Sequence, residues 1–426
     1  MDSRPVDSGK SDYSYQLGKV TRRIAKEHEE IAKKIDLNED KYISDKELKQ
    51  YLRKPEVDVL RDPDKVSVDE KKVLKEYKTF LSGKIPREVK NYHSYKQISE
   101  ELQNLAKKNP DLCKVVSLGK TYEGRDIWAL KVSKGAQGDT SDKIGIVITG
   151  ATHAREWATA EIPLRSAREL VNGYSTDDRM KARLDRAEIW IIPVLNPDGF
   201  TYSKTEYSMW RKNRRPIEKT ACDIANGGKI TDLQGDQEKK IKGIGVDLNR
   251  NYWDGNKEHY YLYRPPGDTP CSTWDDFSAT SDYPKSDTYR GPEGASESEI
   301  QAIRDLELNH KNIKGILDYH SYGRMIMYPW GHTYEDAQNE DFYLALGKKM
   351  SAAMKDNYKV IQSSDLYPAS GTSEDMHHIN KRISFTIEVG RSFMPGESDL
   401  KKIVEDGHNA NLVFIDSMIE NKNKLV

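Results

Sequence analysis

Short apolar runs alternate with longer segments of helical periodicity along most of this chain. The apolar runs, each about as long as a buried strand, lie at 126–132, 144–149, 189–194, 313–318 and 383–387. Apolar residues at helical spacing occupy 157–171, 341–354 and 401–419. A short continuous apolar run is typical of a buried strand, whereas a helix shows a period near 3.6 residues. The alternation predicts an α/β domain with a mixed, largely parallel central sheet flanked by helices.

The first part of the chain has a different pattern. Residues 1–16 are polar, which predicts a flexible N-terminus. Apolar residues recur at helical spacing within 17–84, so we expect a small all-α module there. Gly83–Pro86 has the composition of a linker. The α/β domain is then expected to span 88–422.

Side chains suited to metal chemistry follow two of the apolar runs directly. His153 and Glu156 come after 144–149, and His320 comes after 313–318. Ligands of α/β sheets bind outside the carboxyl ends of the strands, so these side chains are expected to lie close together. Zinc takes nitrogen and oxygen ligands, and a catalytic zinc has three protein ligands and one open position. The sequence therefore predicts a zinc site built from His153, Glu156 and His320.

Six segments in a fixed order extend this pattern to the rest of the α/β domain. They are Thr152–Trp157, Met209–Arg214, Val246–Asn251, Tyr319–Tyr322, Leu366–Gly371 and Phe385–Glu388. Together they closely resemble the zinc carboxypeptidases of the pancreatic carboxypeptidase A and B type, over about residues 88–420. The resemblance implies a zinc-dependent exopeptidase that hydrolyses the C-terminal peptide bond of peptides and proteins.

The resemblance also implies catalytic roles. His153, Glu156 and His320 match the zinc ligands, and Glu388 matches the general base that takes a proton from water and passes it to the leaving amine. Arg214 matches the arginine that faces the carbonyl of the bond to be cleaved, where a cation stabilises the developing oxyanion.

Further residues match those that bind the substrate. Asn249 and Arg250 match the pair that holds the terminal carboxylate, which a guanidinium can meet through two parallel hydrogen bonds. Tyr367 matches the mobile tyrosine that closes over the bound residue. The matches to outer substrate subsites are Arg155, Arg211 and Tyr322.

A single position in the loop that follows the mobile tyrosine predicts which residue is removed from the substrate. In the family this position lies at the base of the specificity pocket, with isoleucine for aliphatic or aromatic residues and aspartate for lysine or arginine. Counting from Tyr367 places Glu374 there, with Asp375 next. A buried carboxylate favours a cationic partner. We therefore expect a preference for C-terminal Lys or Arg, or a broad specificity if Glu374 turns away.

The segment Asp36–Glu47 has the layout of an EF-hand calcium loop, with a helical pattern on each side. The expected calcium ligands are Asp36, Asn38, Asp40, Tyr42 through its carbonyl, and Glu47. Lys41 stands where glycine normally makes the sharp turn, which is expected to weaken the site. An acidic, solvated loop between two helices is the alternative interpretation. A melting temperature that does not depend on calcium would exclude a stabilising calcium site.

Composition restricts the partners. Lys+Arg total 68 and Asp+Glu 69, so no basic excess indicates nucleic acid, and no apolar stretch reaches the length of a membrane span. We expect a monomer. The first residues lack a secretory signal, so the protein is intracellular, or extracellular or periplasmic if a signal has been removed. Cys222 and Cys271 either pair or stay reduced, and Cys113 is expected to be a buried thiol.

Three alternative functions share parts of this pattern. Zinc amidases that deacylate small conjugates use a similar ligand set but do not need Asn249 and Arg250 together with Tyr367. Cell-wall peptidases of similar design also trim peptide ends. A calcium-dependent peptide-binding protein with an inactive site is disfavoured, because the expected zinc ligands, Arg214 and Glu388 are all present.

Overall fold

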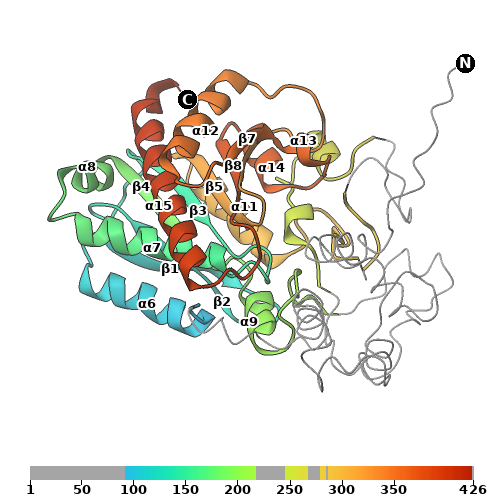
Figure 1. The fold of residues 1–426 in the computed structure, drawn as a ribbon, viewed down its shortest axis with the longest axis horizontal. Coiled ribbons are helices and arrows are strands. Elements are labelled where there is room, and N and C mark those ends of the chain that lie inside the picture. Colours follow the sequence, from blue (N-terminus) through green and yellow to red (C-terminus); the bar gives the residue numbers. More distant parts are fainter. Residues whose placement is uncertain (1–91, 217–244, 267–278, 285, 425–426) are drawn as a thin grey trace, which may run out of the picture. The chain divides into compact units, whose positions relative to one another are not determined.

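The computed structural model describes residues 92–216, 245–266, 279–284 and 286–424 (Figure 1). The expected flexible N-terminus, the EF-hand-like module with its calcium ligands, and both Cys222 and Cys271 lie outside these residues and stay predictions. Cys113 is buried and its thiol is free. Among the helices that the structure describes, none combines the length and apolar character that crossing a membrane requires.

The described residues contain helices, strands and short 3-10 helices (η) in alternation. In chain order they are α6 (Tyr95–Lys108), β1 (Cys113–Lys120), β2 (Asp126–Val132), β3 (Ile144–Thr149), α7 (Ala158–Gly173), α8 (Asp178–Arg186), β4 (Ala187–Ile192), α9 (Pro197–Thr205), η4 (Leu248–Arg250), η5 (Lys257–Leu262), α11 (Ser298–Asn309), β5 (Ile313–Ser321), β6 (Met325–Tyr328), α12 (Glu340–Ala353), β7 (Lys359–Gln362), α13 (Ser363–Leu366), α14 (Ser373–Ile379), β8 (Ile383–Val389), α15 (Glu397–Glu420) and η6 (Lys422–Lys424).

All the described strands belong to one eight-stranded sheet with the order β1-β2-β4-β3-β5-β8-β6-β7. The four central strands β4, β3, β5 and β8 run parallel to one another. The pairs β1–β2, β2–β4 and β6–β8 are antiparallel, and β6 and β7 are parallel. This is the mixed, largely parallel sheet that the alternation of apolar runs and helical segments predicts, so the predicted fold class of the α/β domain is confirmed.

Each face of the sheet is covered by helices, because the central strands are apolar on both sides. Ile146 and Ile148 of β3 belong to one hydrophobic core, and Val147 between them belongs to another. The first core includes residues of α7, α12 and α15, of which α7 and α15 lie side by side (Figure 1). The second core includes residues of α11 and α14. The result is a three-layer sandwich in which the four central strands are largely buried.

Local sequence signals set the limits of several helices. Ser94 caps α6, because its hydroxyl accepts from the backbone N–H of Gln97 while the Gln97 side chain accepts from the N–H of Ser94. Asp177 caps α8 by accepting from two backbone N–H groups. These side chain–backbone hydrogen bonds explain where the chain leaves a loop and enters each helix.

The order of the central strands positions the polar strand ends. Strands β3, β5 and β8 are neighbours, and their carboxyl ends share one edge of the sheet. In the register of β5 and β8, His320 lies opposite Glu388, and in that of β3 and β5, Thr149 lies opposite Asp318. Residues separated by more than 230 positions are thereby brought to one place, from His153 just after β3 to Glu388 near the end of β8.

Candidate metal centre and active site

The turn after β3 presents His153 toward the neighbouring strands. Gly150 begins this turn, and a Cβ there would lie 2.2 Å from the carbonyl oxygen of Thr159, so the close approach of the two backbones requires glycine. Ala151 follows with φ of 50°, and its N–H donates to the hydroxyl of Thr159 at 2.8 Å. That hydroxyl donates to the carbonyl of Glu156 at 2.6 Å. The start of α7 therefore fixes the turn that carries both His153 and Glu156.

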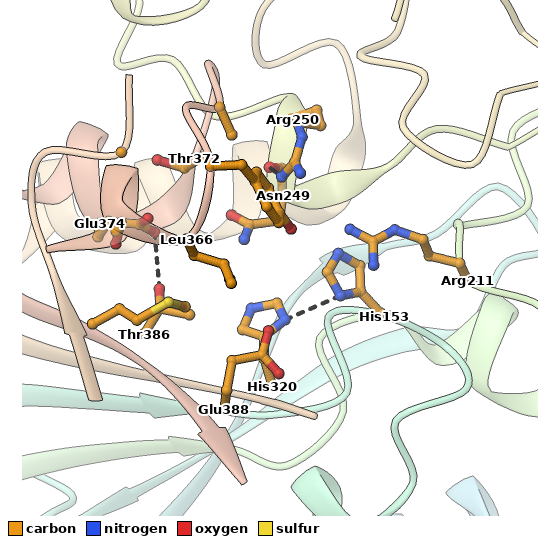
Figure 2. Close-up of a pocket in the computed structure, with 15 residues that line it drawn as sticks. His153, Arg211, Asn249, Arg250, His320, Leu366, Thr372, Glu374, Thr386 and Glu388 are labelled. Atoms are coloured by element: carbon orange, nitrogen blue, oxygen red, sulfur yellow. Dashed lines mark hydrogen bonds between the residues drawn. The ribbon is translucent and has the colours of Figure 1, made fainter. Parts of the chain in front are cut away.

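The two histidines and the glutamate converge on one point. His153 Nδ1 lies 2.9 Å from Glu156 Oε1. It also lies 3.0 Å from His320 Nδ1 (Figure 2). His320 Nδ1 lies 3.2 Å from Glu156 Oε2. One donor atom from each of the three residues lies within 4.8 Å of the others, and all three side chains are buried. The structure thus brings together the three residues that the sequence predicts as zinc ligands.

The donor set fits zinc by its chemistry. Two imidazole nitrogens and one carboxylate are ligands that a catalytic zinc takes, and they leave one position open. Burial alone would raise the pKa of Glu156, but the two facing histidines hold it below its usual range, so the glutamate is a carboxylate. A divalent cation bound between the two imidazoles would compensate the buried negative charge of this carboxylate.

A further carboxylate lies behind His153. Asp247 Oδ1 lies 3.0 Å from His153 Nε2, the ring nitrogen opposite the one that faces Glu156. Arg211 donates to Asp247 Oδ2 through Nε at 3.0 Å and through Nη2 at 2.9 Å. Burial would raise the pKa of Asp247, but Arg211 and His153 hold it well below its usual range. A partner of this kind fixes the ring orientation of a metal-binding histidine.

A cavity extends from His153 and His320 toward the loop that carries Tyr367. Its lining residues are His153, Arg211, Asn249, Arg250, His320, Met327, Gly331, Ser363, Leu366, Tyr367, Ala369, Thr372, Glu374, Thr386 and Glu388. Figure 2 shows Glu388 beside His320, with Arg211 beyond His153 and Glu374 on the far side of the cavity. Two of the candidate metal ligands, two carboxylates, two arginines and a tyrosine thus line the same cavity.

Residues 98–410 match the family model described as zinc carboxypeptidase. The chain belongs to the zinc carboxypeptidase family. It is 32% identical to rat carboxypeptidase A2 over 304 residues, which is 70% of this chain and 62% of that relative. The chain thus matches less than two thirds of the length of this curated relative.

Solved structures of carboxypeptidase-like proteins have a similar fold. Bovine thrombin-activatable fibrinolysis inhibitor, in complex with tick carboxypeptidase inhibitor, has a TM-score of 0.62 and 25% identity, covering 78% of this chain and 98% of that one. Carboxypeptidase A from Helicoverpa armigera has a TM-score of 0.60 and 26% identity, covering 77% of this chain and 73% of that one.

The two arginines of the segment Met209–Arg214 have different surroundings in the structure. Arg211 lines the cavity next to His153 (Figure 2). Arg214 does not line it, because its guanidinium lies 3.8 Å from the centre of the Tyr202 ring and donates to Glu123 at 3.4 Å. The sequence resemblance assigns the carbonyl-facing role to Arg214 and an outer role to Arg211. Among the described residues Arg211 lines the cavity and Arg214 does not, so the structure does not place Arg214 where the resemblance expects it.

The residues expected to hold a substrate carboxylate lie together at the cavity. Asn249 and Arg250 come from η4, and the Arg250 guanidinium lies 5.9 Å from the centre of the Tyr367 ring. Backbone carbonyls fix Arg250, since Nε donates to Ala279 at 2.8 Å and Nη1 to Asn249 at 2.6 Å. Tyr367 is 43% exposed, which suits a side chain that moves over a ligand.

The two acidic residues after Tyr367 face different ways. Glu374 lines the cavity, and its Oε2 accepts from the Thr386 hydroxyl at 2.8 Å (Figure 2). Asp375 instead accepts from the backbone N–H groups of Gly331 and His332 at 2.7 and 3.0 Å. Burial raises the pKa of Glu374, and the Asp375 carboxylate adds to the effect. Among the described residues no basic side chain is in ion-pair contact with Glu374, so a cation entering the cavity would meet a carboxylate held by the Thr386 hydroxyl.

Arg155 and Tyr322 lie outside the cavity lining, in an aromatic cluster. The Arg155 guanidinium lies 4.5 Å from the centre of the Phe393 ring, and the Tyr322 ring meets the same phenylalanine edge-on at 4.9 Å. Arg155 also donates to the exposed carboxylate of Asp287 at 3.2 Å. The sequence motifs contain Arg155 and Tyr322, but no short-range pattern connects either residue with Phe393.

Proposed function

We propose that this chain is a zinc-dependent exopeptidase that hydrolyses the C-terminal peptide bond of peptides and proteins. The observation that carries the proposal is the shared cavity, which is lined by two zinc ligands, His153 and His320, and also by Arg250 and Glu388. A site that joins a hydrolytic metal to an arginine suited to a carboxylate selects chain ends. Membership of the zinc carboxypeptidase family supports the same activity.

The residues around the cavity have separate roles in the reaction. His153, Glu156 and His320 would hold the zinc, which when bound would supply a Lewis acid that makes water a nucleophile near neutral pH. Glu388 takes a proton from the attacking water and gives it to the amine that leaves.

Cationic and polar side chains hold the substrate in place. Arg211 donates to the carbonyl oxygen as negative charge develops on it, a role that its place in the cavity supports. Asn249 and Arg250 hold the terminal carboxylate, and Tyr367 closes over the terminal residue. Arg155 and Tyr322 contact residues further along the peptide.

The base of the cavity supports a preference for C-terminal lysine or arginine. Glu374 is buried there and receives a hydrogen bond from Thr386, a neutral donor. A cationic side chain would offset the cost of holding this carboxylate in its ionised form, which an apolar side chain cannot do. Because Asp375 is held by backbone N–H groups, the preference depends on Glu374 alone.

Peptides of one sequence that end in Arg, Lys, Phe or Glu test the activity and the preference together. We expect release of the single terminal residue, fastest from Arg and Lys, and no reaction of the C-terminal amide of the Arg peptide. A zinc chelator should abolish release and added zinc should restore it. Cleavage inside the peptide, or of the amide, would rule out an exopeptidase. If Phe is released ten times faster than Arg, only the preference is wrong.

The variant Glu374→Gln tests the pocket directly. Removing one partner of a buried charge pair costs about 2–5 kcal/mol, and the amide keeps the shape of the side chain, so we expect the low end of this range. The kcat/KM on the Arg peptide should fall by about 30-fold, while kcat/KM on the Phe peptide stays within about twofold or rises. An Asp375→Asn variant should leave the ratio of the two substrates unchanged, because that side chain lies outside the lining. Equal losses on both peptides would refute the role of Glu374.

Calcium binding by Asp36–Glu47 stays a prediction from the sequence. Its ligand pattern supports a stabilising role, and calcium-dependent melting remains the observation expected of it.

A further inference from the structure

Both histidines of the metal centre have a carboxylate at the ring nitrogen that points away from the other ligands. For His153 this carboxylate is Asp247, as described above. For His320 it is Asp318, whose Oδ2 lies 3.1 Å from His320 Nε2. The Nδ1 atom of His320 faces Glu156 and His153, so the ring lies between Asp318 and the point where the metal ligands converge.

Asp318 is held on its other side by two hydroxyl groups. Thr149 donates to Asp318 Oδ1 at 2.6 Å and Thr152 donates to the same oxygen at 3.0 Å. Thr149 lies opposite Asp318 in the register of β3 and β5, and Thr152 lies in the turn that carries His153. One carboxylate is thus fixed by the strand next to it and by the loop of the other histidine.

The position of Asp318 requires a physical reason. Its side chain is buried, and an ionised carboxylate out of water is costly unless it is paired. Among the residues that the structure describes, the only basic side chain in ion-pair contact with Asp318 is His320. The Thr149 and Thr152 hydroxyls and the imidazole N–H of His320 donate hydrogen bonds to the carboxylate. The imidazole can donate only while His320 keeps a proton on Nε2. The pairing therefore selects the tautomer that leaves the Nδ1 lone pair for a metal.

We propose that Asp318 is a positioning residue of the zinc centre, which sets the tautomer and orientation of His320 and increases its basicity as a ligand. This inference rests on the metal centre of the proposed function but not on the identity of the substrate. Partners of this kind typically change metal affinity by about 10–100-fold when they are replaced. Because Thr149 and Thr152 fix the carboxylate, the effect should depend on its orientation as well as on its charge.

Zinc affinity of the full chain, measured by competition with a chromophoric chelator, tests the proposal. Asp318→Asn keeps the shape and can still accept from Nε2, so we expect the zinc dissociation constant to rise about 10-fold. Asp318→Ala removes the acceptor, and a rise of up to about 100-fold is expected. Thr149→Val should give a smaller rise and Thr149→Ser should restore the parent value. The visible spectrum of the cobalt-loaded Asp318→Asn protein should also differ from that of the parent.

Asp198→Asn is the matched control. Asp198 is equally buried and accepts from a threonine hydroxyl and an arginine, but it contacts no metal ligand. The zinc affinity and the cobalt spectrum of the Asp198→Asn variant should equal those of the parent. The proposal is overturned if the zinc dissociation constant of Asp318→Asn lies within twofold of the parent value. It is also overturned if Asp198→Asn raises this constant as much as Asp318→Asn does. Both outcomes can be read even if Asp318→Ala fails to fold. A parent chain that binds no zinc would instead overturn the metal centre itself, and with it the proposed function.

Discussion

A Glu388→Gln variant is expected to retain zinc and to lose about 10²–10⁴-fold in kcat on a peptide with a C-terminal arginine. Glu388 lies on β8 opposite His320 of β5 and lines the cavity with it. Glutamine keeps the size of the side chain and its hydrogen-bonding oxygen, but it cannot take a proton from water. The loss should therefore appear in kcat, while KM and the zinc content stay close to those of the parent.

Steady-state kinetics and metal analysis of the purified variant check this expectation. The matched control is Glu374→Gln assayed on the Phe peptide, because Glu374 is a carboxylate of the same cavity on the side away from the metal ligands (Figure 2). That control should keep its kcat. A Glu388→Gln variant with more than a tenth of the parent kcat would exclude Glu388 as the general base. Among the described residues that line the cavity, the only other carboxylate is Glu374, on the side away from the metal ligands.

The central strands could be predicted from the sequence because burial on both faces leaves a simple pattern. The apolar runs 144–149 and 383–387 coincide with most of β3 and β8. By contrast, β1 is half-exposed and pairs only with β2 at one edge of the sheet. Its mixture of lysines, serine and apolar residues contains no continuous apolar run, so the pattern does not predict a strand there. The period of a pattern thus predicts the interior of the sheet better than its margins.

The metal ligands could be predicted because the carboxyl ends of neighbouring parallel strands meet at one edge. His153, Glu156 and His320 need only this rule and the positions of β3 and β5. The choice between Glu374 and Asp375 needs more, because adjacent residues on α14 differ only in what packs around them. Asp318 was within an expected strand, but its contact with His320 follows from the alternation of side chains along β5. That alternation was available in the sequence and marks Asp318 as a neighbour of the site.

The largest difference between sequence and structure concerns Arg211 and Arg214. Two residues lie between them, and both arginines belong to the same basic segment, so the composition of the segment does not say which of them enters the cavity. In the structure Arg214 is buried against Tyr202 and Trp210, with its guanidinium 5.0 Å from the centre of the tryptophan ring. Arg211 is held by Asp247 and lines the cavity. Aromatic packing, which the sequence order does not reveal, distinguishes the two side chains.

We therefore expect Arg211→Met to lower kcat by about 10²–10³-fold, the usual effect of removing one oxyanion donor. Arg214→Met should keep kcat within about threefold and should instead lower the melting temperature, because it removes a buried cation from two aromatic rings. Activity on the Arg peptide and thermal unfolding of both variants measure these two effects. The opposite result, with loss of kcat in the Arg214 variant alone, would return the oxyanion role to Arg214.

Zinc affinity separates the catalytic role of Arg211 from its contact with Asp247. Because Asp247 also holds His153, a variant at Arg211 could act only by loosening the metal centre. In that case the zinc dissociation constant would rise, and excess zinc would restore kcat. If Arg211 stabilises charge on the substrate carbonyl, kcat stays low at saturating zinc, and Arg211→Lys recovers part of it because a cation is again present in the cavity. If excess zinc restores kcat of the Arg211 variant in full, Arg211 acts only as a positioning residue for Asp247.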